Sequence, residues 1–422
     1  MNNARAVWML GAFLGLASSF VPVAKGQEWT RFRGPNGQGI SEATGLPVKW
    51  TESDHNWKIE LPGVGHSSPV IWGDKVFITC GDQKTGHGAL VALHVADGRQ
   101  LWREDHVMSK YRMNVLNTYA TATPALDADH VYTLWPAADE IVLAATDHDG
   151  GGLWRRTFGG HQSQHGSGTS PIVVGDIVVF TCEHEDSTNK EAKSFWIAVD
   201  RMTGQTRWEL PRQTGPKTSY STPCVYSPAG GAVQLVFESQ RHGMTGVDPL
   251  TGKVLWEVES AFPSRVVSSP VIAGGLLIGS CGDGSSGKRL IAIRPGAEGK
   301  PEEVYKVEDG APYVPTSIAV GGLLFTFHDR GYVSCHRSDT GKRLWREKPA
   351  KRFFSSPVSV EGRLYCITPD GDVVVIKAAE TYELLATNPL GEKSQATPAV
   401  AEGRLYLRTY SHLISIGPKS NR

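Results

Sequence analysis

The side chains best suited to binding or chemistry lie where an otherwise repetitive chain is interrupted. Residues 103–123 and 155–170 are rich in Tyr, His, Asn, Gln and Arg and do not follow the repeat. Aromatic rings beside cations and amides can hold a flat ligand, an anion or an extended peptide. We therefore predict a ligand- or partner-binding rim formed by His66, Tyr111, Arg112, Asn117, Tyr119, His161, His165, Tyr220, Arg265, Tyr313, Arg352 and Gln395. The alternative is that these residues only cover the rim of the fold.

No catalytic residue and no metal site are predicted. His161 and His165 have the i, i+4 spacing that places two ligands on one face of a helix, but the surrounding glycines favour a loop. The acidic run at residues 183–186 is interpreted as a solvated loop, with calcium binding as the alternative. Three aspartates beside glycines are expected in hairpin turns: Asp283, Asp329 and Asp370.

The polar and aromatic stretches are positioned by a repeated segment, which is clearest at residues 66–102. It consists of Ser/Thr-Pro, two apolar runs around a glycine turn, a third alternating run, and Asp/Thr-Gly-x-x-x-Trp. Short strands repeated roughly every 40 to 50 residues are typical of propeller blades. The predicted fold is an all-β, eight-bladed β-propeller of four-stranded antiparallel blades. Serines such as Ser67 and Ser68 recur in every blade, so we interpret them as structural and not as nucleophiles.

A tryptophan near the end of most repeats is predicted to dock one blade on the next: Trp57, Trp102, Trp154, Trp208, Trp256 and Trp345. Its large ring can fill the wedge between adjacent blades. Tyr305 and Leu385 replace it in the two weaker repeats. A glycine stands four residues before five of these tryptophans, where a tight hairpin requires positive φ.

The two ends of the repeat region complement each other. Trp57 lies in a repeat end that has no beginning before it, while the last repeat stops before any Gly-x-x-x-Trp. We therefore predict that the strand around Trp57 completes the last blade, and that this closure removes exposed strand edges. The predicted domains are a signal peptide at residues 1–26, an ordered strap over the propeller at residues 27–55, and the propeller at residues 56–418.

The start of the chain and its charge restrict where the protein works. Arg5, an apolar run and small residues at 24–26 predict a secretory signal peptide, and no later segment is long and apolar enough to span a membrane. The chain is therefore expected to be exported to the periplasm or the extracellular space, as a monomer. Lys plus Arg and Asp plus Glu both number 43, without a basic block, which argues against nucleic acid as a partner. The six cysteines are expected to be mostly buried thiols, with one disulfide as the alternative.

The docking pattern carries a family resemblance. Residues 198–208 match A-x-D-x-x-T-G-x-x-x-W in full, and residues 246–256 match all but its first position. Over about residues 57 to 416 the chain resembles the pyrroloquinoline-quinone-type (PQQ-like) β-propeller repeat family. That family includes quinoprotein dehydrogenases, which are enzymes, and BamB-like scaffold proteins of the bacterial envelope, which are not. The opening Trp29-x-x-Phe32-Arg33-Gly34-Pro35 is similar to secreted propeller proteins of planctomycete-type bacteria.

The resemblance implies two alternative functions, and they differ in the residues that each one requires. The dehydrogenases imply PQQ beside a calcium ion held by Glu, Asn and Asp, a catalytic Asp, and commonly a vicinal Cys-Cys pair. This sequence has no Cys-Cys and no Cys-x-x-Cys-His, and the calcium ligands cannot be placed on the rim. We therefore predict an exported, non-catalytic scaffold or binding protein that presents its rim to a protein or an envelope polymer, without a cofactor. The alternative is a PQQ-dependent alcohol or sugar dehydrogenase containing PQQ and calcium.

Overall fold

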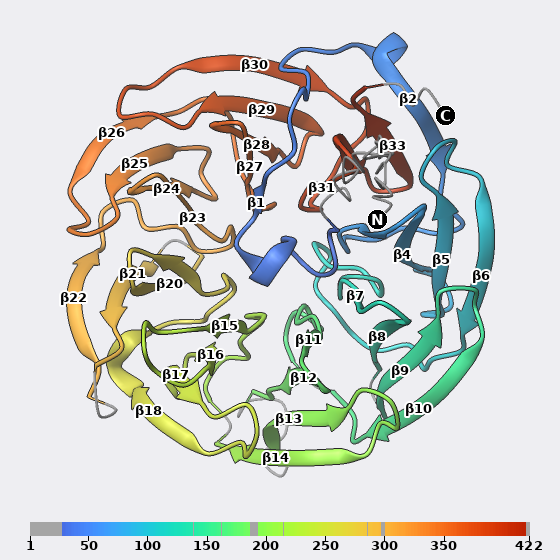
Figure 1. The fold of residues 1–422 in the computed structure, drawn as a ribbon, viewed down its shortest axis with the longest axis horizontal. Coiled ribbons are helices and arrows are strands. Elements are labelled where there is room, and N and C mark those ends of the chain that lie inside the picture. The colour runs from blue at the N-terminus through green and yellow to red at the C-terminus, as the bar shows by residue number, and fades with distance from the viewer. Residues whose placement is uncertain are drawn as a thin grey trace, which may run out of the picture.

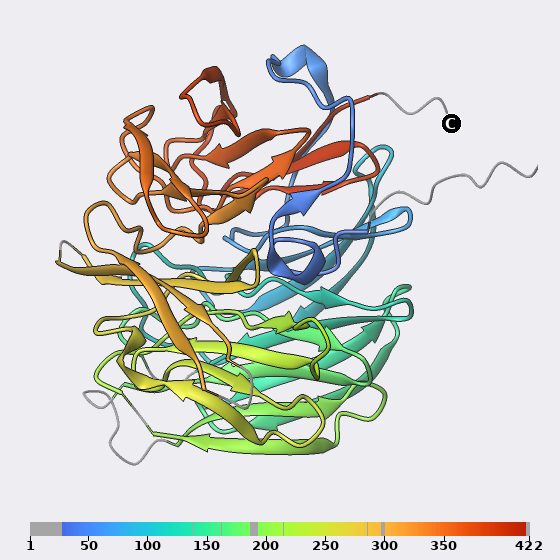
Figure 2. The same ribbon diagram turned by 60° about the vertical axis from the view of Figure 1, so that its left-hand side comes forward.

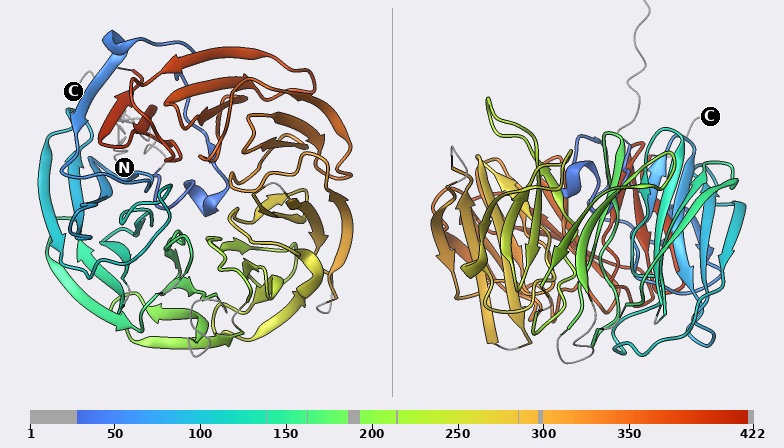
Figure 3. Two further views of the ribbon diagram at one scale, coloured as in Figure 1. Left: turned by 180° about the vertical axis from the view of Figure 1, so that it is seen from behind. Right: turned by 90° about the horizontal axis from the view of Figure 1, so that it is seen from below.

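The computed structural model describes residues 28–137, 139–161, 163–185, 193–213, 215–284, 286–296 and 300–418. The predicted signal peptide lies outside the described residues. Eight antiparallel blades surround a central channel, as the face view in Figure 1 and the side view in Figure 3 show. The predicted eight-bladed fold is confirmed.

The first four blades each use four consecutive strands, beginning with the strand next to the channel. Blade one contains β3 (Val70–Trp72), β4 (Lys75–Gly81), β5 (Gly88–His94) and β6 (Gln100–His106). Blade two contains β7 (Ala125–Leu126), β8 (His130–Pro136), β9 (Ile141–Asp147) and β10 (Gly152–Phe158). Blade three contains β11 (Ile172–Val174), β12 (Ile177–Cys182), β13 (Ser194–Asp200) and β14 (Thr206–Arg212). Blade four contains β15 (Cys224–Tyr226), β16 (Gln234–Ser239), β17 (Gly243–Val247) and β18 (Val254–Val258).

The other four blades complete the ring. Blade five contains β19 (Val271–Ala273), β20 (Leu276–Asp283), β21 (Ser286–Arg294) and β22 (Glu302–Val307), and follows the short helix η3 (Glu259–Ala261). Blade six contains β23 (Ile318–Val320), β24 (Leu323–Phe327), β25 (Val333–Arg337) and β26 (Arg343–Glu347). Blade seven contains β27 (Val358–Val360), β28 (Arg363–Ile367), β29 (Asp372–Lys377) and β30 (Leu384–Pro389). Blade eight contains β31 (Ala399–Ala401), β32 (Arg404–Arg408), β33 (His412–Ile416) and β2 (His55–Glu60).

The burial of each strand follows from its place in the blade. Middle strands such as β4 are packed between two neighbouring blades, so they are continuous apolar runs and almost wholly buried. Outermost strands such as β14 alternate between buried and exposed positions. In blade eight, β2 pairs antiparallel with β33, with Lys58 opposite Ile414. The predicted closure of the ring by the N-terminal strand is confirmed.

The docking tryptophans share one arrangement. The indole N–H of Trp57, for example, donates to the carbonyl oxygen of Val95 in the next blade at 2.9 Å, and its ring covers Gly98. Trp102, Trp154, Trp208 and Trp345 make equivalent bonds, as does the Tyr305 hydroxyl. Trp256 differs, because it donates to the side chain of Gln234 in its own blade. The five glycines expected to have positive φ do so: Gly98, Gly150, Gly204, Gly252 and Gly341.

The residues before the first blade enter the channel instead of only lying over the propeller. Trp29 pairs with Ile71 of blade one, and the short helix η1 (Pro35–Gly37) lies near the centre of the ring, coloured blue in Figure 1. After η1, the strand β1 (Ile40–Ser41) pairs in parallel with β27. The chain then crosses blade seven to η2 (Glu52–Asp54) at the perimeter, as Figure 2 shows. We call residues 28–41 the plug.

The plug is held by the inner strands of blades distant in the sequence. The Asn36 amide accepts from Val225 N–H and donates to Val225 C=O, and Gln38 accepts from Ile272 N–H. The Arg33 guanidinium donates to Ser317 C=O at 2.8 Å. These bonds satisfy backbone groups of channel-lining strands that have no further strand beside them. The plug therefore closes the channel.

Candidate functional site

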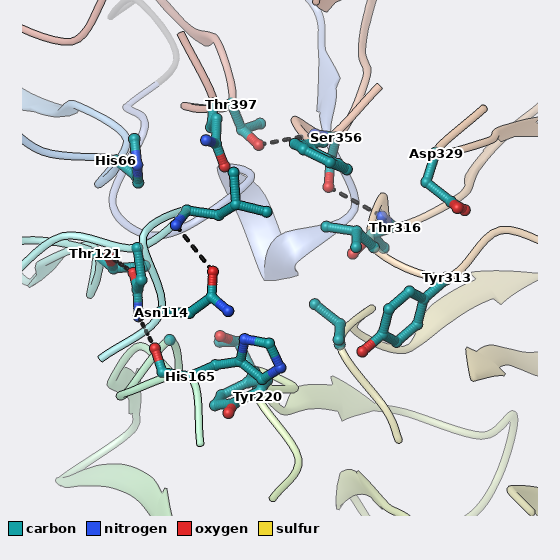
Figure 4. Close-up of a pocket in the computed structure, with 18 of the residues that line it drawn as sticks. His66, Asn114, Thr121, His165, Tyr220, Tyr313, Thr316, Asp329, Ser356 and Thr397 are labelled. Carbon is teal, nitrogen blue, oxygen red and sulfur yellow. Dashed lines mark hydrogen bonds between the residues drawn. The ribbon is translucent and has the colours of Figure 1, made fainter. Parts of the chain in front are cut away.

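The candidate site is a cavity of about 560 Å³ in the channel. Its walls come from the loops that join the outermost strand of one blade to the innermost strand of the next, and we call the face that carries these loops the mouth face. Phe32 is the one described lining residue that comes from the plug. Figure 4 shows His66, His165, Tyr220 and Tyr313 around the opening, each from a different mouth loop. The cavity is therefore bordered by the mouth loops and by the plug.

A belt of hydrogen bonds surrounds the cavity wall. In each bond, the backbone N–H of a Ser or Thr just before one blade's innermost strand donates to the Ser or Thr hydroxyl at the same position in the next blade. A proline follows this residue in every blade except blade six, where Thr316 comes after Pro315. The donors run in order from Ser68 through Thr123, Ser170, Thr222, Ser269 and Thr316 to Ser356, and the last acceptor is Thr397. The recurring Ser/Thr-Pro anchors therefore have the structural role expected for residues present in every blade.

The belt has one open link, between blades eight and one. The Ser68 hydroxyl has no hydrogen-bond partner among the described residues. Arg408 of β32 bridges these blades instead, donating to Ser67 C=O at 3.1 Å and to Thr79 C=O at 2.8 Å. Arg408 is fully buried, and this burial lowers the pKa of its guanidinium to about 10. The guanidinium is therefore still protonated at neutral pH.

Seven of the predicted rim residues line the cavity: His66, Asn117, His165, Tyr220, Tyr313, Arg352 and Gln395. The other five lie elsewhere. Tyr111 and Tyr119 pack edge to face behind the wall, and Arg112 is exposed outside it. His161 and Arg265 are buried. The structure thus brings together residues from seven mouth loops, but not the whole predicted set.

Arg265 is part of a buried network behind the wall. It forms an ion pair with Glu185 at 2.8 Å, in which both side chains are at most 2% exposed, and it donates to Gln164 at 3.1 Å. It also contacts the Tyr313 hydroxyl at 3.5 Å. The network holds Tyr313 beside the cavity while the Arg265 charge is balanced by Glu185.

The interpretation of residues 183–186 as a solvated loop is wrong for the described part of that run. His184 and Glu185 are buried, and Glu183 accepts a hydrogen bond from the Trp196 indole. The reason is the long-range pairing of Glu185 with Arg265, which a local run of acidic letters does not reveal. Asp186 lies outside the described residues.

The histidines near the cavity are neutral at pH 7. Burial, with a smaller effect of the nearby Arg408 charge, lowers the pKa of His66 to about 4. Burial, followed by the charge of Arg265, also lowers the pKa of His165. The buried His161 ring lies beside that of His184, with ring centres 5.8 Å apart and the planes tilted by 36°. In the described part of the chain, the one group with metal-ligand geometry is Asp127, Asp129 and His130.

That acidic group is accounted for without a metal. It lies in the turn between β7 and β8, and none of its members lines the cavity. Asp127 accepts from Arg201 at 2.8 Å and from the Tyr132 hydroxyl at 2.8 Å. Burial alone would raise the pKa of Asp127, but hydrogen bonds from Asp129, Arg201 and Tyr132 outweigh it and lower that pKa to about 2. Asp127 therefore acts as the anion of an interblade ion pair.

A second depression, which we call the groove, continues from the cavity across the mouth face. It has a volume of about 720 Å³ and shares His66, Leu116, Arg352, Phe354 and Gln395 with the cavity. It also includes Val115, Tyr410 and charges of both signs: Lys351, Lys393, Asp370 and Glu392. Val115 is 98% exposed and Leu116 is 51% exposed. The polar and aromatic pattern used for the rim prediction did not select these two aliphatic residues, although they lie in the longest mouth loop.

A family model described as outer membrane protein assembly factor BamB matches residues 48–222, 184–347 and 329–416. The chain belongs to the BamB family. A search of curated proteins gave no match. No helix in the described ranges is long and apolar enough to cross a membrane.

Solved structures share the BamB-family fold at low sequence identity. BamB from Moraxella catarrhalis is 14% identical with a TM-score of 0.58, covering 86% of this chain and 97% of its own. A europium-containing methanol dehydrogenase is 12% identical with a TM-score of 0.67, covering 90% and 89%. The computationally designed protein Ika8 is 12% identical with a TM-score of 0.63, covering 86% and 100%. An enzyme, an assembly factor and a design share this architecture, so the fold does not choose a function.

The cavity does not supply the residues that the quinone-dependent alternative requires. Among its described lining residues the only carboxylate is Asp329, in the turn after β24 where a hairpin aspartate was expected. Its Oδ2 accepts from Lys288 at 2.5 Å. A calcium ion needs several oxygen ligands around one point. One carboxylate already paired with a lysine does not fit calcium and PQQ.

Proposed function

We propose that this chain is an exported, non-catalytic propeller that binds a protein through the groove. The observation that carries the proposal is the exposed pair Val115 and Leu116 at the groove's edge. Covering a large aliphatic side chain stabilises a complex by roughly 1.5 to 3 kcal/mol. Two neighbouring ones beside a depression are therefore a suitable contact for a partner's apolar residues.

The rest of the groove has the composition of a protein interface. Phe354 and Tyr410 provide aromatic surface, and lysines and acidic residues provide charges of both signs. An apolar, aromatic centre with a polar rim is the usual arrangement where proteins bind each other. Membership of a family described as an assembly factor also favours a protein over an envelope polymer. Export rests on the predicted signal peptide.

Affinity measurements test the groove. Peptides are selected by display on the chain starting at residue 28, and their dissociation constants are then measured by calorimetry. Val115→Asp should weaken binding at least about tenfold, because it places a charge in the apolar contact. Leu250→Asp is the matched control, since Leu250 is 85% exposed in a turn on the opposite face. Equal affinities for wild type and Val115→Asp would reject the groove as the protein site.

A second measurement tests the absence of catalysis. Purified chain is mixed with PQQ and Ca²⁺ and supplied with alcohols or sugars and an electron-accepting dye. We expect neither cofactor absorbance on the protein nor dye reduction, because Asp329, the one carboxylate among the described lining residues of the cavity, is paired with Lys288. Substrate-dependent dye reduction would show that the protein is an enzyme.

A further inference from the structure

We propose that the cavity binds a small organic anion, in which a carboxylate or phosphate is attached to an apolar body. The inference does not depend on the protein partner proposed for the groove. It rests on three features of the cavity: a ring of unused hydroxyl donors, buried cations without carboxylate partners directly behind the wall, and an apolar lining.

The hydroxyl donors come from the belt. Six belt hydroxyls line the cavity, on residues that are only 2–4% exposed: Thr123, Ser170, Thr222, Thr316, Ser356 and Thr397. Each oxygen already accepts a backbone N–H. No hydrogen bond donated by these hydroxyls occurs in the part of the chain that the structure describes. Each therefore retains a proton to donate, and converging donors of this kind favour an anionic acceptor.

Three buried guanidinium groups lie behind the same wall. Arg31, Arg33 and Arg408 are at most 6% exposed, and none forms an ion pair with a described carboxylate. They donate to the carbonyl oxygens of Pro223, Ser317 and Ser67. Each of these carbonyls belongs to the residue directly after a cavity-lining residue. Charges in such a low-dielectric interior are weakly screened, so they raise the electrostatic potential inside the cavity.

These guanidinium groups remain charged under ordinary conditions. Burial lowers the pKa of Arg31 to about 10 and that of Arg33 to about 9, both well above neutral pH. Among the neighbouring charges, Asp283 is negative and acts on Tyr313 and His165, but it is exposed and therefore screened by solvent and salt. Asp329 is balanced by Lys288, Arg265 is balanced by Glu185, and the exposed Arg330 and Arg352 add positive charge at the opening.

The apolar and aromatic lining residues indicate what the uncharged part of the ligand is. Phe32, Val267, Val314 and Phe354 give apolar surface, and Tyr220 and Tyr313 give aromatic surface. A volume of about 560 Å³ is in the range of small-molecule sites. An apolar body of one or two rings, or a medium alkyl chain, with one anionic group would use both the lining and the hydroxyl ring.

Two fluorescent probes with the same ring system test the charge requirement. Anilinonaphthalene sulfonate carries a negative charge, and N-phenyl-1-naphthylamine is its neutral counterpart. The chain starting at residue 28 should bind the sulfonate at least about tenfold more tightly, which corresponds to about 1.4 kcal/mol. Octanoate or octyl phosphate should displace the sulfonate, and octanol should not. Equal affinity for both probes, or displacement by octanol, would overturn the inference.

Substitutions in the cavity test whether the sulfonate probe binds there. Val314→Trp fills the cavity and should weaken sulfonate binding at least about tenfold, while Leu250→Trp on the opposite face should leave it unchanged. Thr316→Val removes one hydroxyl donor and should weaken the sulfonate several-fold without affecting the neutral probe. Melting temperatures confirm that each variant is folded. Unchanged sulfonate affinity in folded Val314→Trp would overturn the cavity site. Val115 lies outside the cavity, so its variant tests the groove separately.

Discussion

The docking tryptophans couple each blade to its neighbour through single residues. Trp208 is 7% exposed, and its indole donates to Pro249 C=O at 2.9 Å. A Cβ atom built on Gly252 would lie only 2.7 Å from the ring, so glycine and tryptophan fit each other closely. This contact explains why the two residue types recur together in the sequence.

Replacing Trp208 by alanine should lower the free energy of unfolding by about 3 to 5 kcal/mol, as large aromatic truncations do. Trp208→Phe keeps an aromatic ring but loses the indole hydrogen bond, and should cost about 1 to 2 kcal/mol. Denaturant titrations of the three proteins measure both effects. A loss below about 1 kcal/mol in Trp208→Ala would contradict the docking role.

Glu238 is an unusual residue of the core between blades four and five. It is 3% exposed, and neither carboxyl oxygen has a hydrogen-bond partner among the described residues. Burial raises the pKa of its carboxyl group well above the ordinary value. The carboxyl group is therefore protonated in the folded protein at pH values where it is ionised in the unfolded chain.

This proton makes stability depend on pH. Above the unfolded pKa of about 4.3, stability should fall as pH rises, by up to about 1.4 kcal/mol per pH unit, until the folded pKa is reached. The cause is that the folded state keeps a proton that the unfolded state has released. Glu238→Gln should remove this part of the slope in denaturant titrations at several pH values. The exposed Glu347→Gln is the control, and the same slope in Glu238→Gln would disprove the explanation.

Among the elements, the plug depends on a tight turn. Gly34 has φ of 64°, and a Cβ atom there would lie 2.4 Å from the Trp29 ring. Gly45 also has positive φ, at 77°, but a Cβ atom there meets nothing within 4 Å. Gly34 also has ψ of −148°, a combination with positive φ that is almost confined to glycine, so a side chain there meets both a strained backbone and crowding, whereas crowding is absent at Gly45.

Gly45→Ala should cost about 1 to 2 kcal/mol from positive φ alone. Gly34→Ala should cost about 1 to 3 kcal/mol more, because its backbone conformation is unfavourable for alanine and the methyl group forces the Trp29 ring or the turn to move. Thermal unfolding measures the difference, and limited proteolysis reports whether residues 28–41 leave the channel. Equal losses in the two variants would show that the plug tolerates movement at Gly34.

The strands were predictable and the path of the plug was not. Ser/Thr-Pro, Gly and Trp positions recur because each blade meets the same packing problem, so a local pattern specified every blade. The plug makes its contacts one at a time, such as Asn36 with Val225 and Arg33 with Ser317, with partners far away in sequence. No periodic signal accompanies such contacts.

The site was predictable only in part for the same reason. His66, Tyr220 and Tyr313 line the cavity because they stand just before the Ser/Thr-Pro anchors, a position that the repeat identifies. Arg265 is in a comparable loop but turns toward Glu185, a charge partner 80 residues away. The distribution of buried charge, on which the anion proposal depends, required the packed structure.

For the whole molecule, β2 supplies the fourth strand of blade eight and so closes the ring. A chain starting at residue 62 lacks both the plug and β2, so β33 becomes an open edge. This variant should aggregate, because free strand edges pair with other chains. A chain starting at residue 28 keeps both elements and should remain monomeric in size-exclusion chromatography with light scattering. A monomeric, folded chain from residue 62 would contradict the need for closure.

The meeting of both chain ends in blade eight also sets the timing of folding. Ser67 and its partner Arg408 are 341 residues apart, and β2 lies slightly farther from β33. β2 therefore has no strand partner until the last strands of the chain are available to pair with it. An incomplete chain is therefore an open ring whose two terminal blades expose surfaces that are buried in the finished ring. Chaperones and proteases can distinguish these two forms.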